Sequence, residues 1–239
     1  MVTEQEAEII KKIFEPKQWN DTLTMSSWAV FKIMGEFVNG FEQLHKIGPC
    51  AAIFGSARTK PGTKYYEMEV ETAQRLAKLG FGVITGGGPG IMEAGNKGAK
   101  KGGSSSVGLS IKLPMEQGTN KYVDYDKDIR FDYFFVRKTI FMRYAQGFIV
   151  MPGGFGTLDE LMEALTLIQT NKLVDFPVVL MGKKYWAGLI DWFKTTLLEE
   201  GMISEGDFDI FHVVDTPQEA VDIIEEFYNK YRPQPNFGL

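Results

Sequence analysis

The feature that most constrains the fold is a repeated alternation of short apolar segments with amphipathic helical stretches, running from Cys50 to Tyr231. The sequence predicts strands at Cys50–Phe54, Phe81–Thr85, Ser106–Ile111, Ile129–Phe131, Gly147–Met151, Val178–Met181 and Phe211–Val214. It predicts intervening helices at Tyr65–Leu79, Ile91–Lys101, Phe134–Ala145, 155–170, Tyr185–Glu200 and Pro217–Tyr231. Such alternation predicts an α/β fold with a doubly wound, mostly parallel sheet covered by helices on both faces.

The same pattern sets the expected domain organisation. No linker rich in proline, glycine or serine divides residues 48 to 231, so we expect one domain over residues 48–239. Residues 1–47 are expected to form an N-terminal helical extension, because apolar residues recur at three- and four-residue steps between Thr24 and His45. This extension either covers one face of the core or forms a dimer contact.

Composition excludes several classes of function. One cysteine and two histidines are too few for a disulfide framework or a cysteine–histidine metal cluster, so no metal is expected. No cofactor is expected either. The net charge of −5 argues against nucleic acid as a partner. The acidic N-terminus does not resemble a signal peptide, and no apolar run approaches the ~20 residues of a membrane span. We therefore expect a cytoplasmic protein without a membrane partner.

Two glycine-rich loops, Gly86–Gly90 and Pro152–Thr157, each lie between a predicted strand and a predicted helix. The carboxyl ends of parallel strands are where open α/β sheets bind ligands, and a helix N-terminus favours an anion. The loops thus predict a phosphate-bearing ligand, with tight strand-to-helix turns as the purely structural alternative. Candidate ligand contacts at these strand ends are Gly55, Ser56, Gly87 and Gly88. The dinucleotide, Walker and nucleophile-elbow patterns are all absent.

Charged and hydroxyl side chains near the second loop strengthen this interpretation. Thr157 can donate its hydroxyl to a phosphate or simply cap the helix, and Glu160 is either a site carboxylate or part of a capping box. Arg137 and Lys138 stand near a predicted helix start, where cations oppose the helix dipole. An anionic substrate would explain that placement, and a solvated pair is the alternative.

These residues resemble a known family. The segment from Gly86 to Ala94, the Arg137–Lys138 pair and the run PGGFGTLDEL from Pro152 are similar to the LONELY GUY (LOG) family, whose signature PGGxGTxxE matches at every fixed position. The resemblance extends over about residues 47–231, and the long N-terminal region is similar to the longer subgroup of the family.

The resemblance implies a Rossmann-like fold and a nucleoside 5′-monophosphate phosphoribohydrolase. Such an enzyme cuts the N-glycosidic bond of AMP or of a cytokinin riboside 5′-monophosphate, giving free base and ribose 5-phosphate. It implies catalytic roles for Arg137 and Glu160, and at least a homodimer with the Arg137–Lys138 helix and the next helix near its interface. The substrate-binding positions that it implies are Glu116, Lys138, Gly153, Gly154, Gly156, Thr157 and Thr166.

The chemistry of N-glycosidic bond cleavage suggests separate roles for Glu160 and Arg137. Breaking a ribosyl C–N bond builds oxocarbenium character, which the Glu160 carboxylate can stabilise while it orients or deprotonates water. Arg137 cannot donate a proton, because its pKa is too high, so we expect it to position Glu160 and keep it ionised. Water and a second acid such as Glu116 are both open as the proton donor to the leaving base.

Two other functions fit the same fold. A non-catalytic nucleotide-binding or carrier protein would keep the glycine loops without needing Glu160 or Arg137. A transferase would move ribosyl phosphate to a second substrate. Members of the family also carry the label lysine decarboxylase, but the sequence offers no recognisable Schiff-base lysine for pyridoxal phosphate.

Overall fold

The computed structural model describes residues 16–112, 118–173 and 176–231, with side chains from residue 28 onward. The chain divides into two compact units, Met1–Glu42 and Gln43–Leu239. The division lies within helix α2 (Pro16–Leu44), which makes up most of the described part of the N-terminal extension. The expected domain boundary at residue 47 stays a prediction. Over the described residues, no helix has both the length and the apolarity needed to cross a membrane.

Helix α2 is apolar over much of its circumference. Between Trp28 and Val38 every residue except Ala29, Lys32, Gly35 and Glu36 has a large apolar side chain. The large apolar side chains that lie exposed on it are Trp28, Val30, Phe31, Met34 and Val38. A helix with this pattern exposes more apolar surface than is usual for a helix on the surface of a soluble protein.

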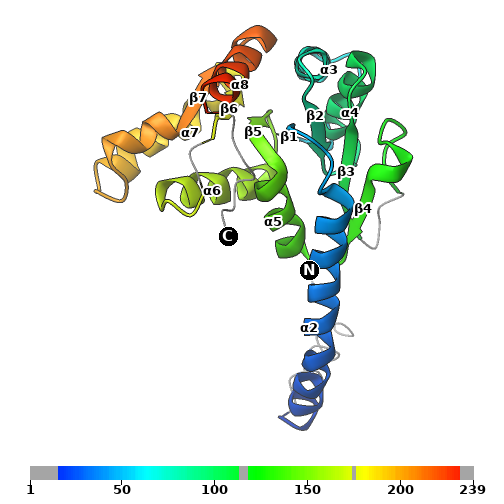
Figure 1. Ribbon diagram of the computed structural model, residues 1–239. Coiled ribbons are helices and arrows are strands. Elements are labelled where there is room, and N and C mark those ends of the chain that lie inside the picture. The colour runs from blue at the N-terminus through cyan, green and yellow to red at the C-terminus, as the bar shows by residue number, and fades with distance from the viewer. Residues whose placement is uncertain (1–15, 113–117, 174–175, 232–239) are drawn as a thin grey trace. The chain divides into compact units, whose positions relative to one another are not determined.

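The second unit alternates strands and helices as the sequence predicts (Figure 1). Its strands are β1 (Cys50–Phe54), β2 (Gly82–Thr85), β3 (Ser106–Ile111), β4 (Asp128–Phe131), β5 (Ala145–Val150), β6 (Val178–Met181) and β7 (Phe211–Val214). Its helices are α3 (Lys64–Lys78), α4 (Ile91–Gly102), α5 (Phe134–Tyr144), α6 (Phe155–Gln169), α7 (Lys183–Trp192) and α8 (Pro217–Tyr231).

One expected helix is broken in the structure. The predicted helix Tyr185–Glu200 begins earlier, at Lys183, and its α-helical part ends at Trp192. A π-helical segment, Phe193–Leu198, continues it. Hydrophobic periodicity alone does not separate these two helical forms over a few residues. The short 3₁₀ turns Tyr125–Lys127 and Glu205–Ile210 were also not predicted.

The strands form one seven-stranded sheet in the order β4-β3-β2-β1-β5-β6-β7. Every neighbouring pair is parallel, which confirms the doubly wound, Rossmann-like architecture. The order runs one way from β1 to β4 and the other way from β5 to β7, so the sheet reverses between β1 and β5. In folds of this kind the ligand crevice lies outside the carboxyl ends of the strands at such a reversal.

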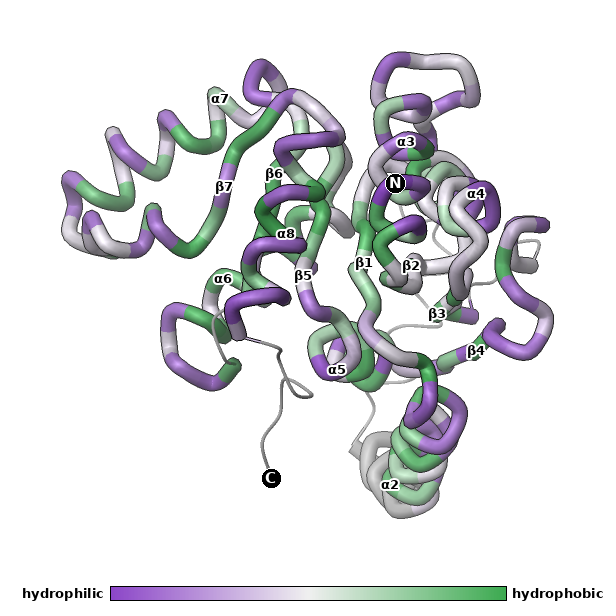
Figure 2. The backbone as a smooth tube through the Cα atoms, turned by 45° about the horizontal axis from the view of Figure 1, so that its top comes forward, coloured by the Kyte–Doolittle hydropathy of each residue, from purple (hydrophilic) through white to green (hydrophobic). Residues whose placement is uncertain are grey.

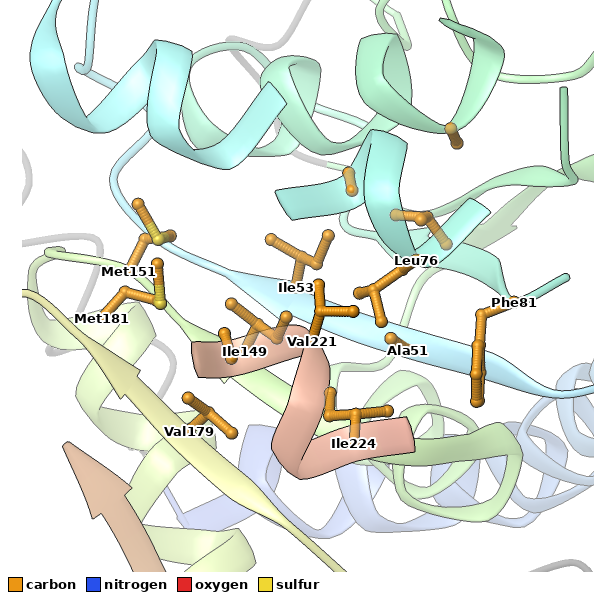
Figure 3. Close-up of a cluster of buried hydrophobic side chains, with 14 of the residues drawn as sticks. Ala51, Ile53, Leu76, Phe81, Ile149, Met151, Val179, Met181, Val221 and Ile224 are labelled. Carbon is orange, nitrogen blue, oxygen red and sulfur yellow. The ribbon is translucent and has the colours of Figure 1, made fainter. Parts of the chain in front are cut away.

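A hydrophobic core cluster lies between one face of the sheet and helices α3, α4 and α8 (Figure 3). Ile53, Ile149 and Val179 point from the strands toward Leu76 of α3 and Val221 of α8. Along α7 and α8 hydrophobic and hydrophilic stretches alternate from turn to turn, as expected for helices that lie on a sheet (Figure 2).

Alternate strand residues fill the opposite face. The ring of Phe54 lies 4.9 Å from that of Phe141 in α5 and 5.0 Å from that of Phe148 in β5. Phe148 in turn contacts Phe176 at 5.0 Å. Because β1 is buried on both faces, it is continuously apolar, and its one cysteine, Cys50, is a buried core residue.

Candidate functional site

A cavity of about 880 Å³ opens beyond the carboxyl ends of β1 and β5, where the strand order reverses. The segment after β1 and the loop between β5 and α6 supply most of its wall, and α5 contributes from the side. Predicted site residues that line it are Gly55, Ser56, Arg137, Gly153, Gly154, Gly156, Thr157 and Glu160. The fold therefore brings together eight positions from three separate segments of the sequence.

Backbone hydrogen bonds join the three loops at this edge. The Ser56 N–H donates to the Pro152 carbonyl at 3.0 Å, and the Ile91 N–H donates to the Ser56 carbonyl at 3.0 Å. Gly90 has φ +71°, and a Cβ there would collide with the Ser56 carbonyl oxygen. A side chain at residue 90 would therefore push the loop after β2 away from the loop after β1.

The second glycine loop provides the N-cap of helix α6 and leaves the first N–H groups of that helix without an intrahelical acceptor. The helix begins at Phe155, and its N-cap residue is Gly154, whose carbonyl accepts the N–H groups of Thr157 and Leu158 at 3.0 Å. The first N–H groups of a helix have no intrahelical acceptor, so those of Phe155 and Gly156 are available to a bound anion.

Thr157 is therefore not the N-cap, and that structural alternative is wrong. It is the third residue of α6, and it is buried. Its hydroxyl occupies the space beside Gly153, where a Cβ would collide with Oγ1. Glu160 lies still further along the helix, outside the capping-box position, so the capping-box alternative is wrong as well.

Arg137 and Glu160 form an ion pair in the cavity wall. Arg137 Nη2 lies 3.4 Å from Glu160 Oε1, and the two side chains are only 14% and 4% exposed. The guanidinium also lies 5.1 Å from the ring centre of Phe134. Glu160 Oε2 is buried and has no hydrogen-bond partner among the described residues. A buried carboxylate oxygen without a partner is costly, which marks it as a group available to a ligand or a water molecule.

Burial raises the pKa of Glu160 from 4.5 to about 7, because the charged form loses solvation. The positive charges of Arg137 and Lys138 lower this pKa but do not outweigh the burial. Arg137 thus favours the ionised form of Glu160, as expected, but burial has the larger effect, and the carboxyl titrates close to neutral pH. That is the range in which a group transfers protons most effectively.

Unlike Arg137, Lys138 does not line the cavity. Its Nζ lies 2.9 Å from Asp159 and 2.6 Å from Glu163, so it joins α5 to α6. The two cations thus have carboxylate partners within the chain itself, Glu160 for Arg137 and Asp159 with Glu163 for Lys138. The placement of this pair near a helix start is explained by these partners and needs no substrate anion.

Three other candidates lie away from the cavity wall. Gly87 and Gly88 do not line it, and their carbonyls accept hydrogen bonds from Asn120 Nδ2 at 3.0 Å. The Thr166 hydroxyl donates to the Met162 carbonyl within α6 at 2.7 Å. Glu116 falls outside the described residues.

Sequence reasoning missed the polar network behind the first glycine loop. Buried Asn96 of α4 accepts from Thr85 Oγ1 at 2.6 Å and from Asn120 Nδ2 at 2.9 Å, and its own Nδ2 donates to Ser106 Oγ at 3.0 Å. Thr85 Oγ1 accepts from the Gly87 N–H at 3.0 Å. A buried asparagine with all its partners satisfied holds the loop rigidly. Its only sequence signal is an amide among the small residues of a helix.

Two further wall residues were also not predicted. Tyr185 lines the cavity, and its hydroxyl donates to the Gly153 carbonyl at 2.6 Å, which steadies the glycine loop. Arg58 lines the cavity from the loop after β1. Both lie outside the recognisable motif, so only the position of their elements reveals them.

The described wall of the cavity contains no lysine. A pyridoxal phosphate enzyme needs a lysine amine there to form its Schiff base, so the residues present do not fit that cofactor. Within the described ranges, no three His, Cys, Asp or Glu side chains are grouped so that they could hold a metal ion.

Comparison with known proteins finds one matching family model and several similar phosphoribohydrolases. The family model described as "Possible lysine decarboxylase" matches residues 92–224. The cytokinin riboside 5′-monophosphate phosphoribohydrolase LOG4 of Arabidopsis thaliana is 28% identical over 194 residues, covering 80% of this chain and 88% of that protein. The cytokinin riboside 5′-monophosphate phosphoribohydrolase of Mycobacterium tuberculosis is 32% identical over 161 residues, covering 65% of this chain and 82% of that protein.

A solved structure shares the fold. The molybdenum cofactor carrier protein of Chlamydomonas reinhardtii superposes with a TM-score of 0.55 at 24% identity, covering 76% of this chain and 98% of that one. At this identity the likeness shows the fold alone.

Proposed function

This chain belongs to the LOG family, and we propose that it hydrolyses the N-glycosidic bond of nucleoside 5′-monophosphates. The products are a free base and ribose 5-phosphate. The substrate class is AMP or a cytokinin riboside 5′-monophosphate, the latter being the class named for the plant and mycobacterial relatives.

The observation that carries this proposal is a single cavity that combines a helix N-terminus with a buried carboxylate. The N-terminus of α6 suits a 5′-phosphate, and Glu160 lies one turn further along the same helix. A phosphate held at the helix start would bring the attached ribose toward Glu160 and Arg137. The volume of about 880 Å³ is within the usual range for small-molecule sites.

In the proposed reaction, the C–N bond to the base breaks and positive charge develops on the ribose ring. The ionised Glu160 stabilises that charge and accepts a proton from the water that attacks the anomeric carbon. With a pKa of about 7, a large fraction of Glu160 is ionised at neutral pH, and the carboxylate is still basic enough to accept a proton. The base leaves with a proton taken from water or another acid.

Arg137 has a positioning role in this scheme. Its guanidinium holds Glu160 Oε1 and leaves Oε2 without a hydrogen-bond partner in the described residues. Its positive charge lowers the pKa of Glu160, which keeps the carboxyl from being wholly protonated at neutral pH. The absence of a lysine from the described cavity wall argues against a decarboxylase that uses pyridoxal phosphate.

The direct test is to incubate the purified protein with a panel of nucleoside 5′-monophosphates and to follow free base and ribose 5-phosphate. We expect stoichiometric release of both from at least one nucleotide, with no requirement for a second substrate. Nucleotide binding without product would instead indicate a carrier, and dependence on an acceptor would indicate a transferase.

We also propose that the protein acts as a homodimer or a larger homo-oligomer. Exposed aromatic side chains on α5, Phe134 and Phe135, and the exposed apolar residues of α2 support this proposal. Surfaces of this kind are usually covered in solution by another protein surface.

A further inference from the structure

A bound nucleotide would add negative charge to the cavity, and cations in the cavity wall would have to balance that charge. A phosphate monoester carries between one and two negative charges at neutral pH. In the described wall, the cations are Arg58 and Arg137, and the anion is Glu160. Because Arg137 is paired with Glu160, which is partly ionised at neutral pH, that pair adds less than one net positive charge. Arg58 is the remaining cation in this part of the cavity.

Arg58 is held at the cavity by its own loop. Its backbone N–H donates to Ser56 Oγ at 3.1 Å. The Ser56 N–H is bonded to the Pro152 carbonyl, so this loop lies directly against the start of the second glycine loop. The Arg58 side chain is exposed, and it forms no ion pair with a carboxylate in the part of the chain that is described.

The hydrogen bond from the Arg58 N–H to Ser56 Oγ also leaves the Ser56 hydroxyl able to donate to a ligand. Its hydroxyl oxygen already accepts the Arg58 N–H, so the hydroxyl proton can be donated to a further acceptor. Ser56 also lines the cavity. A serine hydroxyl, an arginine fork and the first N–H groups of a helix form a set of donors suited to the three terminal oxygens of a phosphate.

We propose that Arg58 is a specificity-determining residue that binds the 5′-phosphate and so discriminates nucleotides from nucleosides. This proposal rests on the proposed function, because it assigns Arg58 to the 5′-phosphate of the proposed nucleotide substrate. Arg58 faces the phosphate from the loop after β1, and the N-terminus of α6 faces it from the loop after β5. Its guanidinium can bind two phosphate oxygens at once, which a lysine ammonium does not reproduce.

The test compares Arg58→Gln and Arg58→Lys with the matched control Lys60→Gln. Lys60 is a second exposed cation in the same loop, and it does not line the cavity. Binding of ribose 5-phosphate, of ribose and of AMP would be measured by calorimetry at two salt concentrations. Thermal unfolding would show that each variant is folded.

We expect Arg58→Gln to weaken ribose 5-phosphate and AMP binding by about 10- to 100-fold, the loss typical of a charge-assisted contact. Arg58→Lys should fall in between, and Lys60→Gln should stay within about twofold of the unchanged protein. In turnover, Arg58→Gln should raise KM for AMP far more than it lowers kcat, and hydrolysis of adenosine should be unaffected.

The proposal is overturned if Arg58→Gln binds ribose 5-phosphate as well as Lys60→Gln does. It is also overturned if the loss is the same for ribose as for ribose 5-phosphate. The proposed function fails separately: if the unchanged protein hydrolyses no nucleotide, Arg58-dependent binding of ribose 5-phosphate would still support the role of Arg58.

Discussion

Arg137 and Glu160 meet across two helices, with Nη2 of the arginine 3.4 Å from Oε1 of the glutamate, yet burial still raises the pKa of Glu160 to about 7. The ion pair is therefore too weak to keep this carboxyl in its ordinary range. Carboxyls with a pKa near the working pH and a free oxygen are typical of catalytic sites.

Replacing Glu160 by Gln should lower kcat for nucleotide hydrolysis by about 100-fold or more, because the amide cannot accept a proton. Ribose 5-phosphate binding should remain, since the proposed phosphate contacts are made by other residues. Asp159→Asn is the matched control, because Asp159 is the neighbouring acid on α6 and is 59% exposed. Full activity in Glu160→Gln would remove Glu160 from the mechanism.

Hydrolysis should depend on pH through the ionisation of Glu160. Activity should rise as pH increases toward about 7 and level off above it, because the ionised form is needed. Arg137→Gln removes a charge that lowers this pKa, so the midpoint of the rate profile should move to higher pH. Rate profiles of kcat against pH for the two proteins measure the shift. An unchanged midpoint would show that another group controls the rate.

Glu160 should also make stability depend on pH. Its folded-state pKa is raised, so the folded protein holds the proton more tightly, and stability is lost as pH rises from about 4.5 to about 7. The free energy of unfolding of Glu160→Gln, relative to the unchanged protein, should therefore increase by about 2 kcal/mol between pH 5 and pH 8. Chemical unfolding at several pH values measures it. A constant difference would contradict the burial of a charge at this position.

The second glycine loop offers a matched pair of substitutions. Gly153→Ala should lower the free energy of unfolding by about 1–3 kcal/mol, because the new methyl group collides with Thr157. Gly154→Ala should change it little, since nothing lies within 4 Å of the added Cβ. Denaturant unfolding of both variants tests this difference, and equal losses would contradict the close approach of Thr157 to Gly153.

The exposed apolar surface of α2 gives a test of self-association. Trp28→Glu combined with Phe31→Glu should reduce the oligomeric mass, because charges would replace side chains that are 74% and 65% exposed. Lys32→Glu, on the same helix but outside the exposed apolar set, should leave the mass unchanged. Light scattering after size-exclusion chromatography measures the mass. An unchanged mass in the double variant would exclude α2 from the interface.

The sequence by itself determined the order and type of nearly every element in the second unit. Strands β1, β3, β6 and β7 have the predicted bounds, because short apolar runs between glycine or proline signals are local features. The motif from Pro152 to Glu160 indicated the family and the edge of the sheet at which to look for a ligand.

Only the tertiary structure decided which residues share the cavity. The sheet order places β1 beside β5, so Ser56 bonds to Pro152 in the loop before α6 and Arg58 lines the same cavity, a pairing that no local pattern encodes. Adjacent Arg137 and Lys138 look equivalent in the sequence, yet successive residues of a helix point in different directions, and only Arg137 lines the cavity. The pKa of Glu160 depends in the same way on the solvent that the folded chain excludes, which is a property of packing and not of the motif.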